Sequence, residues 1–209
     1  MNRKDFLSSV VPLVTVASTV AGTKKINDED SLKIPAYLKE GDIIGITCPS
    51  GFITQEEIRP AVTKLQEWGF QVKVGKTVGE KDFTFGGNDE LRTGDLQQML
   101  DDRDIDAILF GRGGYGAVRI IDNIDFTTFK NNPKWLIGFS DATVFHSHLN
   151  RNFGIASIHS KMCNSFPADW SKAEASQIET IDSIRKCLNG EKMEYTAVAN
   201  EKNRKGKGE

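Results

Sequence analysis

The stretch Trp135-Leu136-Ile137-Gly138-Phe139-Ser140-Asp141-Ala142 sets the expectation for the whole chain. A short apolar run, typical of a buried strand, ends in Gly-x-Ser, and a helix-like pattern begins directly afterwards. This order predicts a sharp strand-to-helix turn that lifts the Ser140 hydroxyl clear of the sheet edge, as in a nucleophile elbow. The alternative is that Ser140 is an ordinary helix N-cap.

Apolar runs and helical patterns alternate on both sides of this stretch. Strands are predicted at residues 43–48, 70–74, 105–110, 136–139, 156–158 and 193–198. Helices are predicted between them, and two begin at capping boxes, Thr54 with Glu57 and Ser171 with Glu174. Strands that alternate with helices favour a mainly parallel sheet covered on both faces. The expected fold class is therefore α/β, a flavodoxin-like or Rossmann-like three-layer domain.

The composition indicates an ordinary globular domain without a strong electrostatic bias. The 27 Lys and Arg residues nearly balance the 29 Asp and Glu residues, which argues against nucleic acid or an anionic membrane as a partner. The three cysteines are an odd number without a C-x-x-C pair, so at most one disulfide is expected. His159 and Cys163 stand four apart without further suitable ligands, so we expect neither a metal nor another cofactor.

Both ends of the chain differ from its centre. Residues 1–22 have a positive start, an apolar middle and a small-residue end, the anatomy of an export signal of the general or twin-arginine type. We expect an exported or periplasmic protein without stable membrane insertion once the signal is removed. The alternative is an N-terminal helix or disordered arm on a cytoplasmic protein. The domain is expected at residues 34–198, and residues 199–209 look like the start of a linker.

A second candidate segment, Gly111-Arg112-Gly113-Gly114-Tyr115-Gly116, follows the strand predicted at 105–110. Like Ser140, it stands at the carboxyl end of a strand, where open α/β sheets place their sites. Its glycines leave backbone N–H groups uncovered, and such groups can stabilise a developing oxyanion. It also matches the G-x-G-x-x-G of dinucleotide-binding proteins, although that fingerprint normally follows the first strand. A plain tight turn is the third interpretation.

The two segments together resemble a known family. Residues 112–119 resemble the R-G-G-Y-G-x-x-R signature of LD-carboxypeptidases, and residues 138–141 resemble their nucleophile motif. The first predicted strand, which closes in Cys48-Pro49-Ser50, is similar to that family's first strand. The resemblance covers roughly residues 34–198. One departure is His159-Ser160-Lys161, where the family commonly has His-Gly-Pro.

The resemblance implies a serine peptidase that removes the terminal D-alanine from murein tetrapeptides. Related members act on microcin-type peptide conjugates. By position, Ser140 would be the nucleophile, and the backbone N–H groups of Asp141 and of Gly113 or Gly114 would hold the oxyanion.

Arg112 and Tyr115 of the same loop are the expected substrate contacts. A guanidinium group binds a carboxylate in a bidentate fork, which makes Arg112 a candidate partner for a substrate carboxylate. The alternative for Arg112 is a structural ion pair.

The general base is not evident from the sequence. In the family, the glutamate and histidine of the triad come from a β-rich C-terminal domain, and we expect this chain to stop before it. His146 and His148 fall on the helix that leads away from Ser140, whereas His159 ends an adjacent strand and is better placed. A hydrogen-bonded structural histidine is the alternative for each of them.

The function expected from the sequence is that of a nucleophile-bearing domain with little activity of its own. Its expected partner is a murein peptide or another small peptide, and a homodimer is compatible with the sequence. Two alternatives remain at this point: a non-catalytic module that holds a peptide carboxylate, and a nucleotide-binding α/β protein.

Overall fold

The computed structural model describes residues 32–193. The export signal predicted at residues 1–22 and the linker predicted at 199–209 lie outside the described residues. The same holds for the strand predicted at 193–198, apart from Met193. Within the described part of the chain, no helix combines the length and the apolar character needed to cross a membrane.

Five parallel strands form the centre of the domain. They are β1 (Ile43–Thr47), β2 (Gln71–Val74), β3 (Ile105–Phe110), β4 (Trp135–Gly138) and β5 (Ile158–His159). Their spatial order is β2-β1-β3-β4-β5, and every neighbouring pair is parallel. This is the flavodoxin-like order rather than the Rossmann-like one, and its switch point lies between β1 and β3. In folds of this order, ligands bind at the carboxyl edge of the sheet beside this switch point.

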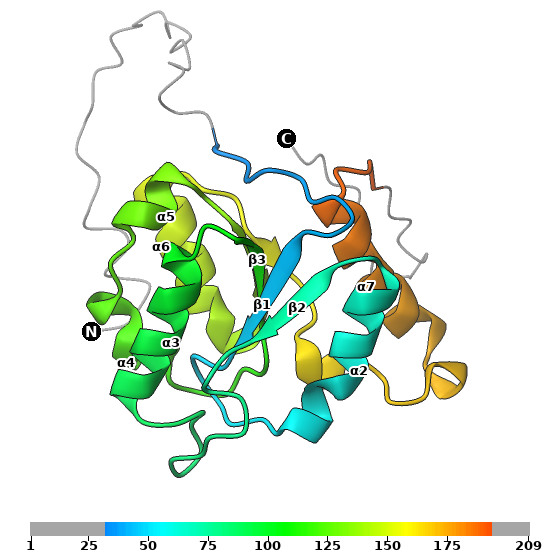
Figure 1. The fold of residues 1–209 in the computed structure, drawn as a ribbon, viewed down its shortest axis with the longest axis horizontal. Coiled ribbons are helices and arrows are strands. Elements are labelled where there is room, and N and C mark those ends of the chain that lie inside the picture. The colour runs from blue at the N-terminus through cyan, green and yellow to red at the C-terminus, as the bar shows by residue number, and fades with distance from the viewer. Residues whose placement is uncertain (1–31, 194–209) are drawn as a thin grey trace, which may run out of the picture. The chain divides into compact units, whose positions relative to one another are not determined.

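Helices cover both faces of the sheet, so the predicted three layers are confirmed (Figure 1). One face carries α2 (Gln55–Glu67) and α7 (Ala175–Leu188), and the other carries α3 (Asp89–Asp101), α4 (Ala117–Ile120), α5 (Thr127–Asn131) and α6 (Thr143–Phe153). Short 3₁₀ turns lie at Ile121–Asn123, Ser140–Ala142, Cys163–Ser165 and Trp170–Lys172.

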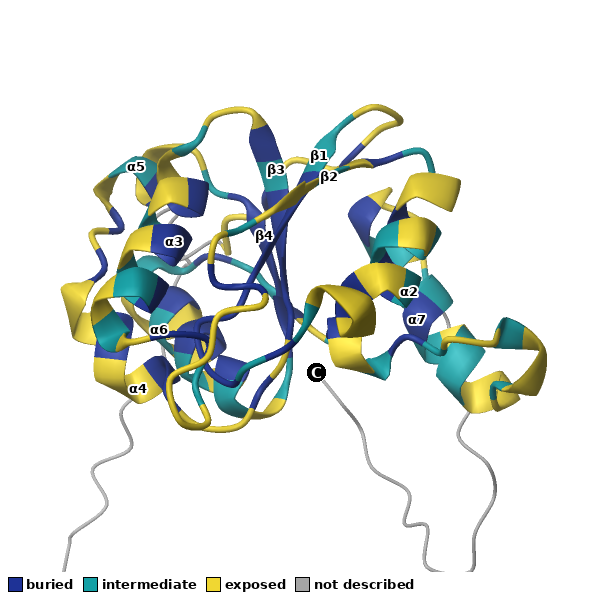
Figure 2. Ribbon diagram, turned by 60° about the horizontal axis from the view of Figure 1, so that its bottom comes forward, coloured by how far each residue is buried: buried dark blue, intermediate teal, exposed yellow. Residues whose placement is uncertain are grey.

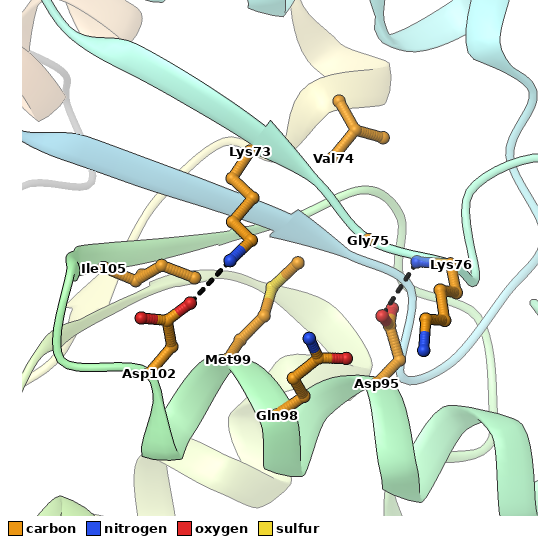
Figure 3. Close-up of a pocket in the computed structure, with 9 residues that line it drawn as sticks. All are labelled: Lys73, Val74, Gly75, Lys76, Asp95, Gln98, Met99, Asp102 and Ile105. Carbon is orange, nitrogen blue, oxygen red and sulfur yellow. Dashed lines mark hydrogen bonds and ion pairs between the residues drawn. The ribbon is translucent and has the colours of Figure 1, made fainter.

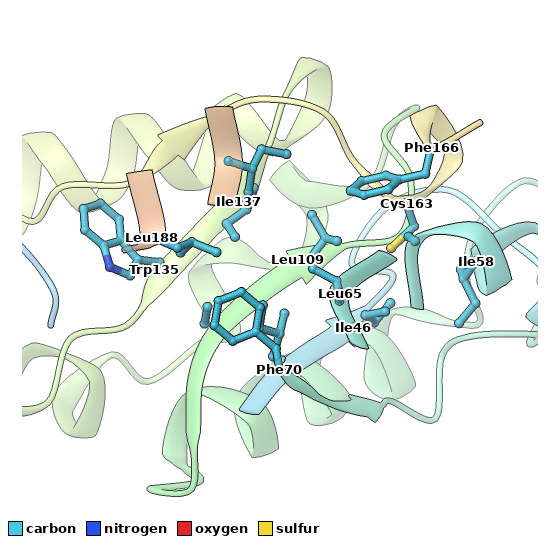
Figure 4. Close-up of a cluster of buried hydrophobic side chains, with 14 of the residues drawn as sticks. Ile46, Ile58, Leu65, Phe70, Leu109, Trp135, Ile137, Cys163, Phe166 and Leu188 are labelled. Atoms are coloured by element: carbon cyan, nitrogen blue, oxygen red, sulfur yellow. The ribbon is translucent and has the colours of Figure 1, made fainter. Parts of the chain in front are cut away.

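Each face of the sheet has its own hydrophobic core. Ile46 and Leu109 point toward α2 and α7, where they pack with Leu65 and its neighbours (Figure 4). Ile108 and Phe110 point the other way, into the core beneath α3 to α6. Because both faces are covered, β3 and β4 are buried almost throughout (Figure 2), which explains why Asp106 is the one charged residue in these two strands. Each such side chain contributes about 1.5–3 kcal/mol when fully buried.

The capping box predicted for α2 is confirmed, and the one predicted for α7 is wrong. Thr54 Oγ1 accepts the Glu57 N–H at 3.1 Å, and Glu57 accepts the Thr54 N–H at 2.8 Å. Ser171 is instead held by Asp169, whose carboxylate accepts both its N–H at 3.0 Å and its hydroxyl at 2.6 Å. The N-cap of α7 is Glu174. Ser171 therefore bonds to the Asp169 carboxylate and does not cap α7.

The fifth strand begins later than predicted. Residues 156–158 were expected to form it, but the Ala156 N–H donates to the Lys33 carbonyl at 2.9 Å. Ile155 also forms an isolated parallel bridge with Lys33. The first part of the predicted strand is therefore used to hold the segment that enters the domain, and pairing with β4 starts only at Ile158.

A buried carboxylate joins α3 to the ends of β1 and β2. Asp95 is only 4% exposed, and it accepts hydrogen bonds from the Thr47 hydroxyl at 2.7 Å and the Thr77 hydroxyl at 2.6 Å. It also accepts the Lys76 N–H at 2.8 Å, at the rim of a small cavity of about 170 Å³ (Figure 3). A buried charge is tolerated when such donors replace water.

We predict that Asp95→Ala lowers the free energy of unfolding by about 3 kcal/mol, because it leaves buried hydroxyl and N–H donors without an acceptor. Asp101→Ala is the matched control, since it removes the same charge from an exposed site on the same helix. Urea denaturation followed by circular dichroism measures both. Equal losses in the two variants would contradict the structural role of Asp95.

Candidate active site

The loops after β1, β3 and β4 meet at the carboxyl edge of the sheet. The Gly51 N–H, after β1, donates to the Gly113 carbonyl in the glycine-rich loop at 3.0 Å. A Cβ atom added at Gly113 would lie 3.3 Å from Ser140 Cβ and 3.5 Å from Ser140 Oγ. One added at Gly51 would lie 2.4 Å from the Gly113 carbonyl oxygen. The structure thus brings the two sequence segments together, and glycine permits the close approach.

Ser140 lies in a strained turn directly after β4. Its φ of 60° is in the left-handed region, which among residues 32–193 only one other non-glycine residue, Phe83, adopts. Such a conformation costs on the order of 1–3 kcal/mol and clusters at functional sites. The side chain is exposed. Phe139 caps the 3₁₀ turn and Ala142 caps α6, so Ser140 is not the helix N-cap considered as its alternative.

The Asp141 carboxylate ties the serine turn to both other loops. Its Oδ2 accepts the Ser50 hydroxyl at 2.6 Å and the Ala117 N–H at 2.8 Å. Ser50 follows β1, and Ala117 is the first residue of α4, directly after the glycine-rich loop. The residue whose N–H is expected in the oxyanion hole therefore also fixes the turn through its side chain. This second role is not visible in the sequence, because the two partners are 91 and 24 residues away along the chain.

Arg92, which sequence analysis did not single out, lies buried beneath the glycine-rich loop. Its guanidinium donates to the carbonyls of Gly116 at 3.0 Å, Gly87 at 3.2 Å and Pro49, and it pairs with Asp89. The side chain is fully buried. Burial lowers the pKa of Arg92, and the neighbouring Asp89 carboxylate opposes that shift. One buried cation thus holds three separate loops.

The spacing of apolar residues in α3 could have indicated that Arg92 is buried. Arg92 stands four residues before Leu96 and seven before Met99, on the helix face that packs against the sheet. A charged residue on an apolar helix face is an indication of a buried, fully partnered group.

Arg119, the last residue of the family-like signature, also has a structural partner. Its Nε and Nη2 donate to the two Asp89 carboxylate oxygens at 3.0 and 2.6 Å. The Arg119 hydrogen bond is the main reason why the pKa of Asp89 lies below its usual value. Both guanidinium groups lie over the Phe85 ring. The distance from Cζ to the ring centroid is 4.8 Å for Arg92 and 5.3 Å for Arg119.

Arg112 and Tyr115 differ from these residues because both are exposed. Arg112 Nη1 donates to the Phe52 carbonyl at the long distance of 3.5 Å. Within residues 32–193, Arg112 forms none of the ion pairs, so the structural ion pair considered for it is not seen there. Arg112, Gly113, Gly114 and Tyr115 line a cavity of about 390 Å³.

His146 is occupied by structural hydrogen bonds. Its Nε2 lies 3.0 Å from the Gly138 carbonyl and its Nδ1 lies 2.8 Å from the Ser157 hydroxyl. Because a carbonyl only accepts, Nε2 carries the proton and Nδ1 accepts from Ser157. Burial lowers the pKa of His146, so the ring stays neutral.

The other two histidines differ in exposure. His148 is half-buried and stacks on Phe126 with ring centroids 5.0 Å apart. His159 is exposed at the end of β5, next to His146, with ring centroids 5.8 Å apart. None of the hydrogen bonds found within residues 32–193 joins a histidine to Ser140.

The three cysteines are free thiols, so the single disulfide considered from the sequence is absent. Cys48 and Cys163 are buried, and burial raises the pKa of Cys48 to about 12 and that of Cys163 well above its usual value. A Cβ atom added at Gly111 would lie 2.7 Å from the Cys48 sulfur. The described part of the chain holds no group of three or more His, Cys, Asp or Glu residues placed to bind a metal ion.

The glycine-rich loop has the wrong surroundings for a dinucleotide site. It follows β3 rather than β1, and the helix that it opens, α4, is four residues long. A dinucleotide fingerprint closes the first strand of its unit and opens a helix whose N-terminus binds the pyrophosphate.

The sequence of this domain matches that of a known protein family. The sequence profile of the LD-carboxypeptidase N-terminal domain matches residues 44–160, which run from β1 to just past β5. The chain belongs to the LD-carboxypeptidase family. The match includes both the glycine-rich loop and the Ser140 turn.

Several LD-carboxypeptidase relatives are similar to this chain. The probable murein peptide carboxypeptidase of Bacillus subtilis is 34% identical over 128 residues, 61% of this chain and 40% of the relative. The murein tetrapeptide carboxypeptidase of Pseudomonas aeruginosa is 25% identical over 151 residues, 70% of this chain and 49% of the relative. The crystal structure of an MccF-like protein from Bacillus anthracis superposes with a TM-score of 0.67 at 28% identity, over 75% of this chain and 47% of that one. The chain spans half or less of the length of these relatives.

We predict that Arg92→Met lowers the free energy of unfolding by about 3 kcal/mol, because three buried carbonyls and Asp89 lose their donor. Arg92→Lys should recover only part of this, since an ammonium group cannot reproduce the planar fork. Arg103→Met is the control, an exposed arginine that forms no ion pair among the described residues. Chemical denaturation measures all three, and a loss from Arg103→Met as large as that from Arg92→Met would refute the prediction.

We also predict that the protein loses stability as the pH falls from about 7 toward 5.5. The folded pKa of His146 lies below its unfolded value of about 6.5, so the unfolded chain binds the extra proton more readily and the free energy of unfolding rises with pH in this window. His146→Gln should flatten that slope, and His148→Gln should leave it in place. Urea titrations at several pH values measure the slope, and an unchanged slope in His146→Gln would count against this origin.

Proposed function

We propose that this chain carries the nucleophile and the oxyanion-binding loop of a serine peptidase that releases D-alanine from murein tetrapeptides. The observation that carries the proposal is the exposed Ser140, with its left-handed backbone, directly beside Gly113 in a member of the LD-carboxypeptidase family. Two relatives named for murein peptides support this substrate class. The microcin C7 self-immunity protein MccF of Escherichia coli, at 26% identity, marks the other substrate class in the family.

In the proposed reaction, Ser140 Oγ attacks the carbonyl carbon of the bond that precedes the terminal D-alanine. The N–H groups of Asp141 and of Gly113 or Gly114 donate to the carbonyl oxygen as it becomes negative. The bond to D-alanine breaks, and the amine leaves with the proton that a general base took from Ser140. Water then hydrolyses the acyl-serine and restores the hydroxyl.

The base in this proposal comes from outside residues 32–193. His146 is occupied at both ring nitrogens and His148 is packed on aromatic rings. His159 is exposed, and none of the hydrogen bonds found within residues 32–193 joins it to Ser140. The family resemblance implies a glutamate and a histidine from a C-terminal domain. A serine without its base loses several orders of magnitude in rate, so we expect slow turnover from the 209 residues alone.

The proposed location is outside the cytoplasm, where murein is found, and it rests on the anatomy of residues 1–22. A homodimer is compatible with this function and stays a prediction.

The test is the release of D-alanine from murein tetrapeptide by the purified chain, followed with D-amino-acid oxidase. We expect slow release that Ser140→Ala reduces to background. Ser147→Ala, an exposed serine of α6, should leave the rate unchanged. Release that is independent of Ser140 would refute the assignment of the nucleophile.

A peptide boronic acid gives a second measurement that needs no turnover, because boron forms a tetrahedral adduct with the serine oxygen while the hydroxyl proton is released to the solvent. It should bind at least about tenfold more weakly to Ser140→Ala, since the adduct occupies the oxyanion site only when Oγ is present. Peptide binding without release, unaffected by Ser140→Ala and lost in Arg112→Ala, would instead indicate a non-catalytic carboxylate-binding module.

A further inference from the structure

The cavity beside the candidate nucleophile has a definite chemical character. Its volume of about 390 Å³ falls in the range of small-ligand sites. Gly113 belongs to its lining and also faces the Ser140 side chain, so the cavity adjoins the position where a bond would be cut. The lining residues are Gly51, Phe52, Lys81, Phe83, Thr84, Arg112, Gly113, Gly114 and Tyr115.

Two cations and no carboxylate line this cavity. Lys81 comes from the loop between β2 and α3, and Arg112 comes from the glycine-rich loop after β3. Both approach Phe52: the Lys81 ammonium lies 5.2 Å from its ring centroid, and Arg112 reaches its carbonyl at 3.5 Å. Among residues 32–193, neither cation forms one of the ion pairs found.

The two cations that line the cavity differ from the neighbouring arginines in their partners. Arg92 and Arg119 both pair with the carboxylate of Asp89, so each has an acidic partner within the domain. Arg112 has one long hydrogen bond to a neutral carbonyl, and Lys81 has an aromatic ring. Arg112 and Lys81 thus reach the cavity without forming an ion pair among residues 32–193, although the Glu57 carboxylate lies close enough to attract Arg112.

The loop that carries Lys81 is held in place. Asp82 and Phe85 exchange two backbone hydrogen bonds, at 3.1 and 2.9 Å, and the Thr84 carbonyl accepts the Phe52 N–H at 3.0 Å. Phe83 stands at the tip of this turn with φ 56° and is 82% exposed. A strained turn that is fixed on both sides and exposes an aromatic ring at a cavity is a pattern found at ligand sites.

We propose that Lys81 and Arg112 together bind the terminal carboxylate of the peptide's leaving residue, and so select peptides with a free C-terminus. This inference rests on the proposed function, because that function places the scissile carbonyl at Ser140. A residue whose amide nitrogen is attached to that carbonyl lies next to Gly113. Its carboxylate then enters the cavity, where two cations replace its water shell.

The test compares the binding of murein tetrapeptide with that of its C-terminal amide. The Ser140→Ala chain is used so that no peptide is consumed, and calorimetry gives both dissociation constants. We expect the free acid to bind at least about tenfold more tightly than the amide, with a ratio that shrinks at high salt. The combined Lys81→Gln and Arg112→Gln substitutions should bring the ratio close to one.

Lys130→Gln is the matched control, because it removes one charge from an exposed site on α5, outside the cavity. It should keep the full ratio. Since Lys81 and Arg112 are exposed, we expect their substitution to leave the thermal unfolding midpoint nearly unchanged, and this measurement confirms that the variants are folded.

Two results would overturn the inference. One is equal binding of acid and amide to Ser140→Ala, including a failure of both to bind. The other is a ratio that survives the double substitution. Neither depends on turnover, so D-alanine release that requires Ser140 could still support the proposed function while the carboxylate assignment fails.

Discussion

The buried guanidinium of Arg92 is the constraint on which the arrangement of the loops depends. A charge without water must find its hydrogen-bond partners inside the protein, and Arg92 finds them on Pro49, Gly87 and Gly116. Pro49 and Gly116 belong to the loops after β1 and β3, and Gly87 belongs to the loop between β2 and α3. Because all three loops must satisfy one rigid, planar group, the position of each limits the positions of the others. The glycine-rich loop is therefore supported from below before any substrate is present.

Asp141 adds a second constraint at the level of the nucleophile. It bonds to Ser50 and Ala117 with one carboxylate oxygen, while the peptide chain on its other side enters the left-handed turn at Ser140. The strain of that turn persists because the surroundings hold both ends of it. Preorganisation of this kind matters for a site that stabilises charge with backbone N–H groups, since the donors must already be aimed when the charge develops.

The sequence predicted the features that depend on local patterns. Mostly apolar runs predicted β1, β3 and β4, and the glycine and serine segments at their ends predicted where the candidate site lies. Errors arose where a distant or stronger partner intervened. Ser171 donates its hydroxyl to Asp169 instead of capping α7. The Ala156 N–H donates to the Lys33 carbonyl, so β5 begins later than predicted.

The support of the site could not be predicted in the same way. The partners of Arg92 and Asp141 are far away along the chain, and single-sequence periodicity contains no information about such pairs. A polar residue on the apolar face of α3 was an available signal that something had to neutralise Arg92, although it did not indicate which loops would do so.

The buried thiols behind the glycine-rich loop have a practical consequence. Cys48 lies so close to Gly111 that a methyl group there would collide with its sulfur, and its high pKa keeps it protonated at neutral pH. Only a thiolate reacts readily with alkylating reagents, so Cys48 and Cys163 become labelled when this edge of the sheet opens to water. The rate of that labelling reports the free energy of local opening at the carboxyl edge of the sheet, as hydrogen exchange does for amides. The two cysteines of the sequence already serve as the probe.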